Sequence, residues 1–546
     1  MKLNRYIILA ILPAILSSCN DWLTEDAPMT NRPADYLTSA GAALQVVNAA
    51  YSPLMWEYNN TYYSEFFIGD IASDDALKGG QNVSDMADAY DIENFKTISN
   101  NGLLLDYYRA NFQGVARANL AMAEVAVMAL DETFDAELRD RIVAEAHFLR
   151  GFYYFRLVRM FGGVPKIEKP IYSSADWVQS RASVDDIFAL IVSDFEAAEA
   201  KLPKKSGYSS DDLGRATSGA AQAMLMKTHM FWAGFKDLGL ASSSVDCWAE
   251  AKEWGDRFML EQTAEYSLCP SYADNFTLEG ENGQESVFEI QYMVEATSDY
   301  GVGNGSTRGT FSTMLMRSRS AKSANAGWGF NKPTDNLVAE FEAGDPRLDA
   351  SVRTPKDSDM STPSEEIYLG CRHVAVKRTL PDSGIEYITL AHASRSPINN
   401  VVIRLADVYL MYAEICLENN DAPAARTYLE KVRSRARGSE DILPAFPAYQ
   451  VPDYRNAYAM HQLTDTAEDL EMAIRHERRV ELAMEGHRWF DLVRWGIVKE
   501  VMDAYKAQES EEARQHMGEF IEGKHELFPI PYEETVLSGL GQNNGY

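Results

Sequence analysis

Apolar residues recur at the spacing of an α-helix over most of this chain. Between residues 141 and 162 they fall every three or four positions, which places one continuous apolar stripe on one helix face. The stripe consists of Ile142, Ala146, Leu149, Tyr153, Leu157 and Met160. Gly162 and Gly163 follow, with Pro165 just beyond, and this combination is typical of the end of a helix. We therefore expect a mainly α fold in which each helix buries one face.

The expected helices come in consecutive pairs. Residues 401–418 and 424–437 both have a helical pattern, and a short polar turn around Asn419 separates them. Residues 215–239 and 248–261 form a similar pair. Small residues fall where paired helices would touch, so that two backbones can approach closely: Ala220, Ala221, Ala413, Ala424 and Ala425. The pairs share no clean fixed period, but their pattern indicates tetratricopeptide-like helical hairpins.

The stretch from Thr263 to Asn400 differs from the rest of the chain. It is rich in Gly, Ser and Thr, and its apolar runs are short, as in Val287 to Ile290. We expect loops with a few short strands over 263–400, inserted within a single domain that spans 36–546. Loops held on a rigid scaffold are where binding residues tend to lie.

The amino-terminal residues predict export and lipid attachment. Lys2 and Arg5 precede an apolar run that is shorter than the roughly 20 residues a membrane-spanning helix needs, so residues 1–18 read as a signal peptide. The sequence Leu-Ser-Ser-Cys that ends at Cys19 resembles the lipobox of bacterial lipoproteins. We expect Cys19 to carry a lipid and residues 19–35 to form a polar tether; the alternative is an ordinary signal peptide with an incidental cysteine. No later stretch of the sequence reaches transmembrane length.

Charge excludes one class of partner. The formal net charge is −30, and such a surface repels phosphate backbones, so we expect no nucleic-acid partner. Binding of a neutral ligand is unaffected by this charge.

The sequence carries no recognisable catalytic motif. HExxH, P-loop and GxSxG patterns are absent, and the glycines at 301, 303 and 305 lack the strand–helix context of a dinucleotide site. We therefore expect no enzyme activity, no cofactor and no catalytic residue. Besides Cys19 there are four cysteines, which form no CxxC pair and have no histidine at zinc-site spacing. We expect no metal site and interpret them as buried free thiols, with disulfides as the alternative for an exported protein: Cys247, Cys269, Cys371 and Cys416.

Charged residues crowd the segment from Arg475 to Arg494. Many are three residues apart, so opposite charges can meet on a helix surface, and we interpret the segment as a structural ion-pair network. Asp74 and Asp75 are adjacent carboxylates, as are Glu365 and Glu366. Neighbours in sequence do not form the facing pair that a glycosidase needs, so we expect both to be turn or surface acids.

Aromatic residues give the clearest hint of a ligand. Those between Trp56 and Phe67 are expected to lie in the core. Tyr90 lies in a polar stretch, and Trp328 stands between two glycines, so each of these two rings is either core or an exposed platform. An exposed ring could stack on the apolar face of a sugar while Asn, Asp and Arg side chains bind its hydroxyls.

Several blocks of sequence in one order resemble the SusD-like (RagB-type) outer-membrane nutrient-binding lipoproteins. The resemblance covers nearly the whole chain. It is carried by CNDWL (19–23), EAHFLRGFYYFRLVRMFGGVP (145–165), RATSGAAQAMLMKTHMFWAG (215–234), NKPTDNLVAEFEAGDPRL (331–348), VIRLADVYLMYAEICLENND (402–421), RHERRVELAMEGHRWFDLVRWG (475–496) and the end from KHELFPIPYEE to GQNNGY (524–546).

The resemblance implies a fold and a function. Tetratricopeptide-like helix pairs would support an irregular, loop-rich ligand-binding half. The protein would bind oligosaccharides on the outer face of the outer membrane and deliver them to a SusC-like TonB-dependent transporter. Binding of peptide or another non-sugar nutrient on the same fold, a surface hydrolase, and a scaffold that binds only protein are the alternatives.

The resemblance also implies where the ligand binds. Glycan sites in this family lie on loops that correspond to 82–94 and 300–330. The candidate ligand-binding residues are therefore Asn82, Tyr90, Tyr300, Arg308, Trp328 and Phe330. The first loop lacks the tryptophans that some members carry there.

Overall fold

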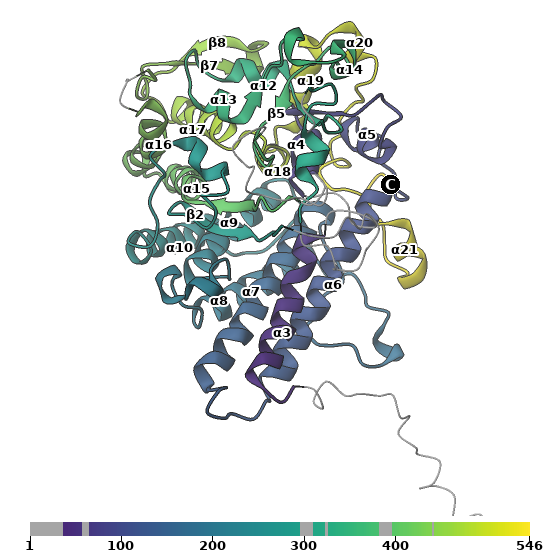
Figure 1. The fold of residues 1–546 in the computed structure, drawn as a ribbon, viewed down its shortest axis with the longest axis vertical. Coiled ribbons are helices and arrows are strands. Elements are labelled where there is room, and N and C mark those ends of the chain that lie inside the picture. The colour runs from purple at the N-terminus through teal and green to yellow at the C-terminus, as the bar shows by residue number, and fades with distance from the viewer. Residues whose placement is uncertain (1–36, 57–64, 295–308, 323–325, 382–395, 439–441) are drawn as a thin grey trace, which may run out of the picture.

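The computed structural model describes residues 37–56, 65–294, 309–322, 326–381, 396–438 and 442–546. Most of the long helices lie in the lower half of the molecule in Figure 1, whereas the upper half contains the short helices and strands together with three long helices between Leu405 and Glu481. The long helices are α3 (Ala40–Tyr51), α6 (Gly102–Val125), α7 (Ala136–Phe161), α8 (Val184–Glu199), α9 (Ser218–Asp237), α10 (Cys247–Glu261), α15 (Leu405–Glu418), α16 (Ala422–Arg437) and α17 (Ala467–Glu481).

Consecutive helices pack against one another, as tetratricopeptide-like hairpins require. α6 packs on α7, α7 on α8, α8 on α9, α9 on α10, and α15 on α16. Both helix pairs predicted from the sequence are thereby confirmed. One boundary differs, because residues 400–404 form a strand and α15 begins only at Leu405. The fold is mainly α, as predicted.

Local signals fix the helix ends. Thr217 accepts a hydrogen bond from the backbone N–H of Ala220 and so caps α9, and Asp135 caps α7 in the same way. α7 ends where predicted, because Gly162 has φ of 69°, a conformation that residues with a side chain rarely adopt.

The upper half contains short elements, as expected for 263–400. Among the residues that the structure describes, the strands pair antiparallel in two-stranded sheets: β1 (Ala76–Gly79) with β3 (Phe330–Pro333), β2 (Ser286–Ile290) with β6 (Asn400–Arg404), β4 (Val352–Arg353) with β5 (Val374–Ala375), and β7 (Gln450–Asp453) with β8 (Ala459–Gln462). The predicted strand over 287–290 is confirmed as part of β2. The short helices are α4 (Glu65–Ile71), α5 (Ala87–Glu93), α11 (Ser312–Met316), α12 (Asp335–Glu340), α13 (Arg347–Ser351), α14 (Pro363–Glu366), α18 (Arg488–Arg494), α19 (Val498–Gln508), α20 (Glu511–Arg514) and α21 (Tyr532–Ser538).

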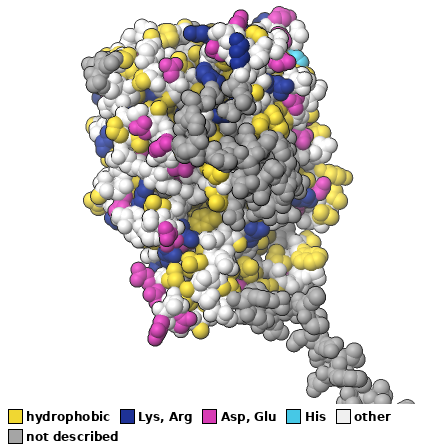
Figure 2. All heavy atoms as spheres, viewed as in Figure 1, with side chains coloured by type: hydrophobic (Ala, Val, Ile, Leu, Met, Phe, Trp, Pro, Cys, Tyr) yellow, Lys and Arg dark blue, Asp and Glu magenta, His cyan; other side chains and the backbone are white. Residues whose placement is uncertain are grey.

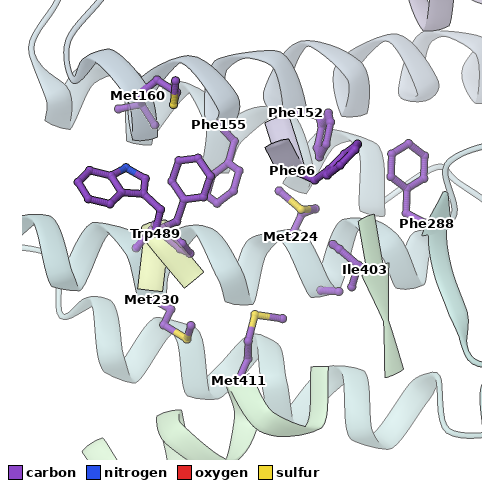
Figure 3. Close-up of a cluster of buried hydrophobic side chains, with 14 of the residues drawn as sticks. Phe66, Phe152, Phe155, Met160, Met224, Met230, Phe288, Ile403, Met411 and Trp489 are labelled. Carbon is purple, nitrogen blue, oxygen red and sulfur yellow. The ribbon is translucent and has the colours of Figure 1, made fainter. Parts of the chain in front are cut away.

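The hydrophobic core joins the two halves. Figure 3 shows side chains from α7, α9, α15 and α18 converging with Phe66 of α4 and Phe288 of β2. Phe288 meets the α7 ring of Phe148 edge-on, with 5.0 Å between ring centres. Because α4 and β2 belong to the upper half, this shared core holds that half on the helical body.

Buried ion pairs connect elements that are far apart in the sequence. The charged segment 475–494 is a structural network, as predicted, but its partners lie mostly elsewhere in the sequence. Arg478 pairs with Asp407 of α15 and with Asp491, and Arg404 pairs with Glu485. Buried charges of this kind are tolerated only when paired, so the network fixes how these elements meet.

Asp74 and Asp75 lie in the turn between α4 and β1, as one of the two predicted options, but they are not surface acids. Both carboxylates are buried, and they pair with Arg479 and Arg488 from the far end of the chain. Of the second acidic pair, Glu365 is exposed as expected, but Glu366 is buried and accepts a hydrogen bond from Lys332. The four cysteines are buried and free, as predicted: Cys247, Cys269, Cys371 and Cys416.

Candidate functional site

The β1–β3 pairing brings the two candidate loops together. Gly79 at the end of β1 faces Phe330 at the start of β3. The N–H of Gly80 donates to the carbonyl of Gly329 across the pair, with an N···O distance of 2.9 Å. All three glycines have positive φ, so the chain turns sharply on both sides of this end. The segment that carries Asn82 and the segment that carries Trp328 therefore leave the same end of one ladder.

The side chain of Lys78 fixes the conformation of the loop that carries Asn82. Its side chain is fully buried, and its Nζ donates to the carbonyls of Gly79, Asn82 and Asp85 at 2.8, 3.1 and 2.6 Å. Burial lowers the pKa of Lys78 to about 8, and the nearby Glu93 partly offsets this effect. A cation that satisfies three loop carbonyls fixes the loop before any ligand arrives.

Asn82 lies at the exposed tip of this loop. Its Oδ1 accepts a hydrogen bond from the N–H of Ser84 at 2.9 Å, which forms a local turn. This bond occupies the side-chain oxygen and fixes the orientation of the side chain. The amide nitrogen of an exposed, oriented asparagine can donate to a ligand oxygen.

Tyr90 on α5 is half-buried and already has partners. Its hydroxyl is 3.0 Å from Nδ1 of His516, and the Nζ of Lys96 lies 5.2 Å from the centre of its ring. Because the lysine covers one ring face, Tyr90 can present at most the other face to a ligand.

Trp328 is half-buried, and its backbone is held by the turn that precedes it. Its N–H donates to the carbonyl of Met314 at 2.8 Å, and its carbonyl accepts from Arg319 at 3.3 Å. The ring packs edge-on against Phe311, with 4.9 Å between centres. An edge contact leaves a ring face uncovered by that partner, as stacking on a sugar requires.

Phe330 was predicted to bind ligand, but its position in the structure does not allow this. The residue is only 2% exposed, and its ring packs edge-on against Phe67 at 6.3 Å while Lys78 lies over it at 5.4 Å. It belongs to the core under the loop and offers no face for stacking. Phe66 and Phe67 are also buried, as expected for their segment. Tyr300 and Arg308 lie outside the described residues.

The structure also reveals two hollows that the sequence did not indicate. The larger, about 720 Å³, lies between the turn at 276–279, α13 with β4, and the segment from β5 to Pro381. The smaller, about 290 Å³, is polar and lies beside β1 between the hairpin at 368–371 and the residues 508–510. Both are assembled from segments far apart in the sequence, so no local pattern could have marked them.

Two absences hold for the part of the chain that the structure describes. There, His, Cys, Asp and Glu side chains form no group of three or more that could hold a metal ion. In the same residues, no helix is both long and apolar enough to cross a membrane.

The fold and site together define a class: a helical-repeat body that carries preformed surface loops, with hollows beside them. Two family profiles match the chain, one described as SusD family over residues 389–546 and one as starch-binding associating with outer membrane over residues 21–230. The chain therefore belongs to the SusD-like family.

Known proteins of this family resemble the chain over its length. SusD-like protein P25 of Formosa agariphila is 24% identical and covers 100% of both chains. A laminarin-binding SusD-like protein matches in structure with a TM-score of 0.74 and 24% identity, covering 93% of this chain and 100% of the other. Surface glycan-binding protein A from Bacteroides thetaiotaomicron, solved in complex with laminarihexaose, matches with a TM-score of 0.73 and 20% identity over 93% and 100%.

Proposed function

We propose that this protein binds oligosaccharides at the end of the β1–β3 ladder. The observation that carries the proposal is the pairing of Gly79 with Phe330, which places the Asn82 loop beside the Trp328 turn. One structural relative binds laminarin, another was solved in complex with laminarihexaose, and one family profile is described as starch-binding. Glycan fragments are therefore the ligand class that the observations favour.

In this proposal each residue has a defined role. Trp328 stacks on the apolar face of one sugar ring, and the amide nitrogen of Asn82 donates to a ring substituent. Tyr90 supports the far side of the site with its uncovered face. A preorganised loop avoids part of the entropy cost of binding, which is the contribution of Lys78.

The binding test uses the mature protein against a glycan array and a peptide panel. Saturable binding to oligosaccharides, with none to peptides, supports the proposal. The reverse result would establish the alternative, a peptide or other non-sugar nutrient binder on this fold. Intact oligosaccharide after prolonged incubation supports the proposal that the protein is not an enzyme.

The proposal extends to location and partner. A lipid on Cys19 would anchor the protein to the outer face of the outer membrane, where residues 19–35 would tether the body near a SusC-like TonB-dependent transporter. The family description of association with the outer membrane supports this location. The Cys19→Ser variant is expected to leave the membrane fraction, and protease added to intact cells is expected to digest the wild-type protein. Resistance to the protease would place the protein on the inner side and contradict delivery from the surface.

A further inference from the structure

A residue near the carboxyl end of the chain contacts the candidate glycan site. His516 follows α20, and its Nδ1 lies 3.0 Å from the hydroxyl oxygen of Tyr90 on α5. The two ring centres are 6.0 Å apart, and the ring planes are nearly perpendicular, at 79°. Because the two residues lie 426 positions apart in the sequence, no local pattern could have indicated this contact.

The backbone around His516 is held by several contacts. Its carbonyl accepts a hydrogen bond from Nζ of Lys96 at 3.2 Å, and Lys506 of α19 donates to the next two carbonyls at 3.1 and 3.2 Å. Gly518 packs so tightly on the end of α5 that an added Cβ would lie 1.8 Å from the carbonyl oxygen of Asn94. The imidazole therefore projects from a segment whose position is fixed before any ligand binds.

The contact with Tyr90 determines which nitrogen of the neutral imidazole carries the proton. A phenol is a stronger donor than acceptor, and the Tyr90 hydroxyl has no other hydrogen-bond partner in the described ranges, so it donates to Nδ1. The proton of the His516 ring then lies on Nε2.

Nε2 of His516 is an unused donor. Within the part of the chain that the structure describes, this atom has no hydrogen-bond partner, and it is not among the buried polar atoms. The hydrogen bond at Nδ1 fixes the plane of the ring, so the N–H on Nε2 has a defined direction. A donor beside the uncovered face of Tyr90 matches a sugar, whose ring has an apolar face and a rim of oxygen atoms.

We propose that His516 is a further ligand-binding residue of the glycan site, which donates from Nε2 to an oxygen of the sugar that packs on Tyr90. The inference rests on the proposed binding of oligosaccharides at this site. It makes the segment after α20 a third part of the site, in addition to the Asn82 loop and the Trp328 turn. It also gives the site a preference, because a sugar that lacks this oxygen leaves the donor unpaired.

The test is a calorimetric titration of the mature protein with neutral glucose hexasaccharides, one α-linked and one β-linked. His516→Gln keeps an amide N–H near the position of Nε2, whereas His516→Asn keeps a polar group near Nδ1 and loses the outer donor. We expect His516→Gln to bind within about threefold of wild type and His516→Asn to bind about five- to tenfold more weakly, as the loss of one hydrogen bond predicts. Gln515→Ala is the matched control, because this neighbour is exposed and its side chain bonds to Glu511 of α20. Its affinity should equal that of wild type.

The order of the two His516 variants separates ligand binding from support of Tyr90. If His516 only positioned Tyr90, His516→Asn would bind as tightly as wild type and His516→Gln would be the weaker variant. That order would overturn the proposal, and so would equal affinity in wild type and both variants. A wild-type protein that binds neither hexasaccharide would contradict the proposed function, and this inference with it.

Thermal melts check that the variants are folded. If either His516 variant fails to fold, Tyr90→Phe decides, because it retains the ring but removes the hydroxyl that orients the imidazole. Tyr90→Phe should weaken oligosaccharide binding several-fold, and unchanged affinity would overturn the proposal.

Discussion

Trp328 and Phe330 are two residues apart, yet the structure gives them different surroundings. Trp328 is half-buried beside Phe311, whereas Phe330 lies in the core against Phe67. Residues two apart would share one face of a continuous strand, but β3 begins only at Phe330, and Gly329 before it has a φ of 68°, so Trp328 lies outside the strand. Sequence alone marked both as ligand contacts, because glycine-rich context does not reveal which side of a strand will be buried.

This difference predicts opposite effects of the same substitution. Trp328→Ala is expected to weaken oligosaccharide binding roughly ten- to hundredfold by removing a stacking anchor, with little loss of stability. Phe330→Ala is expected to cost about 3–5 kcal/mol of unfolding free energy, as truncation of a buried phenylalanine does. Calorimetric titration and thermal melts measure both. A Trp328→Ala protein that is folded and binds as tightly as wild type would exclude this ring from the site.

Lys78 is the residue whose loss should loosen the loop. Lys78→Met removes the donor from three carbonyls, and each buried carbonyl left unpaired costs on the order of 1–3 kcal/mol unless water reaches it. We expect faster amide hydrogen exchange over residues 79–86 and weaker oligosaccharide binding. Lys96→Met is the matched control, because Lys96 lies near the same site but donates to the carbonyl of His516 instead. Equal amide hydrogen exchange in wild type and Lys78→Met would show that the loop keeps its conformation without this lysine.

At the scale of elements, helices were predictable and pairings between distant strands were not. The apolar stripe of α7 and the pairs α9–α10 and α15–α16 follow from local spacing, which a sequence displays directly. The β1–β3 ladder joins residues more than two hundred positions apart, for example Ala76 and Pro333. Nothing near Asp74 in the sequence marks its burial, since its partner Arg488 lies at the other end of the chain.

At one position, helix packing should reverse the usual effect of replacing a helical glycine by alanine. Alanine normally stabilises a helix relative to glycine by about 1 kcal/mol. In α6, however, a Cβ on Gly114 would lie 2.2 Å from the ring of Tyr153 on α7, so Gly114→Ala should lower the melting temperature. Gly41→Ala in α3 is the control, because its Cβ would meet nothing closer than 3.9 Å and should not destabilise. A melting temperature for Gly114→Ala at or above wild type would mean that α6 and α7 are not packed this closely.

The ion pairs between elements predict a response to acid. Burial by itself raises the pKa of a carboxylate. For Glu65 the nearby charges of Arg159 and Arg156 outweigh this effect and lower the pKa to about 2. For Glu485 the charges of Arg404 and Lys377 do the same, and its pKa is also about 2. Because these values lie below those of the unfolded chain, the carboxylates bind protons more weakly when folded. Their stabilisation is complete above about pH 4.5 and is lost as the pH falls toward 2. Urea denaturation at a series of pH values should show this decline, and Glu485→Gln should flatten it.

At the scale of the whole molecule, charge should decide between glycan classes. Acidic side chains gather at the lower end of the helical half in Figure 2, where the turn between α6 and α7 carries exposed Asp131, Glu132 and Asp135. With a net charge of −30, the protein should repel a polyanionic glycan at long range and leave a neutral one unaffected.

Salt separates this long-range effect from the chemistry of the site. Since ions screen charges beyond about 10 Å at 0.1 M, a sulfated oligosaccharide should bind weakly at low salt and more tightly as salt increases. The affinity for a neutral oligosaccharide of equal length should stay constant over the same series. The opposite trend, in which a sulfated ligand binds best at low salt, would mean that local cations override the net charge. Arg319 lies beside Trp328, and Lys96 lies beside Tyr90. In that case, the variants Arg319→Gln and Lys96→Gln would show which of these two cations attracts the sulfated ligand.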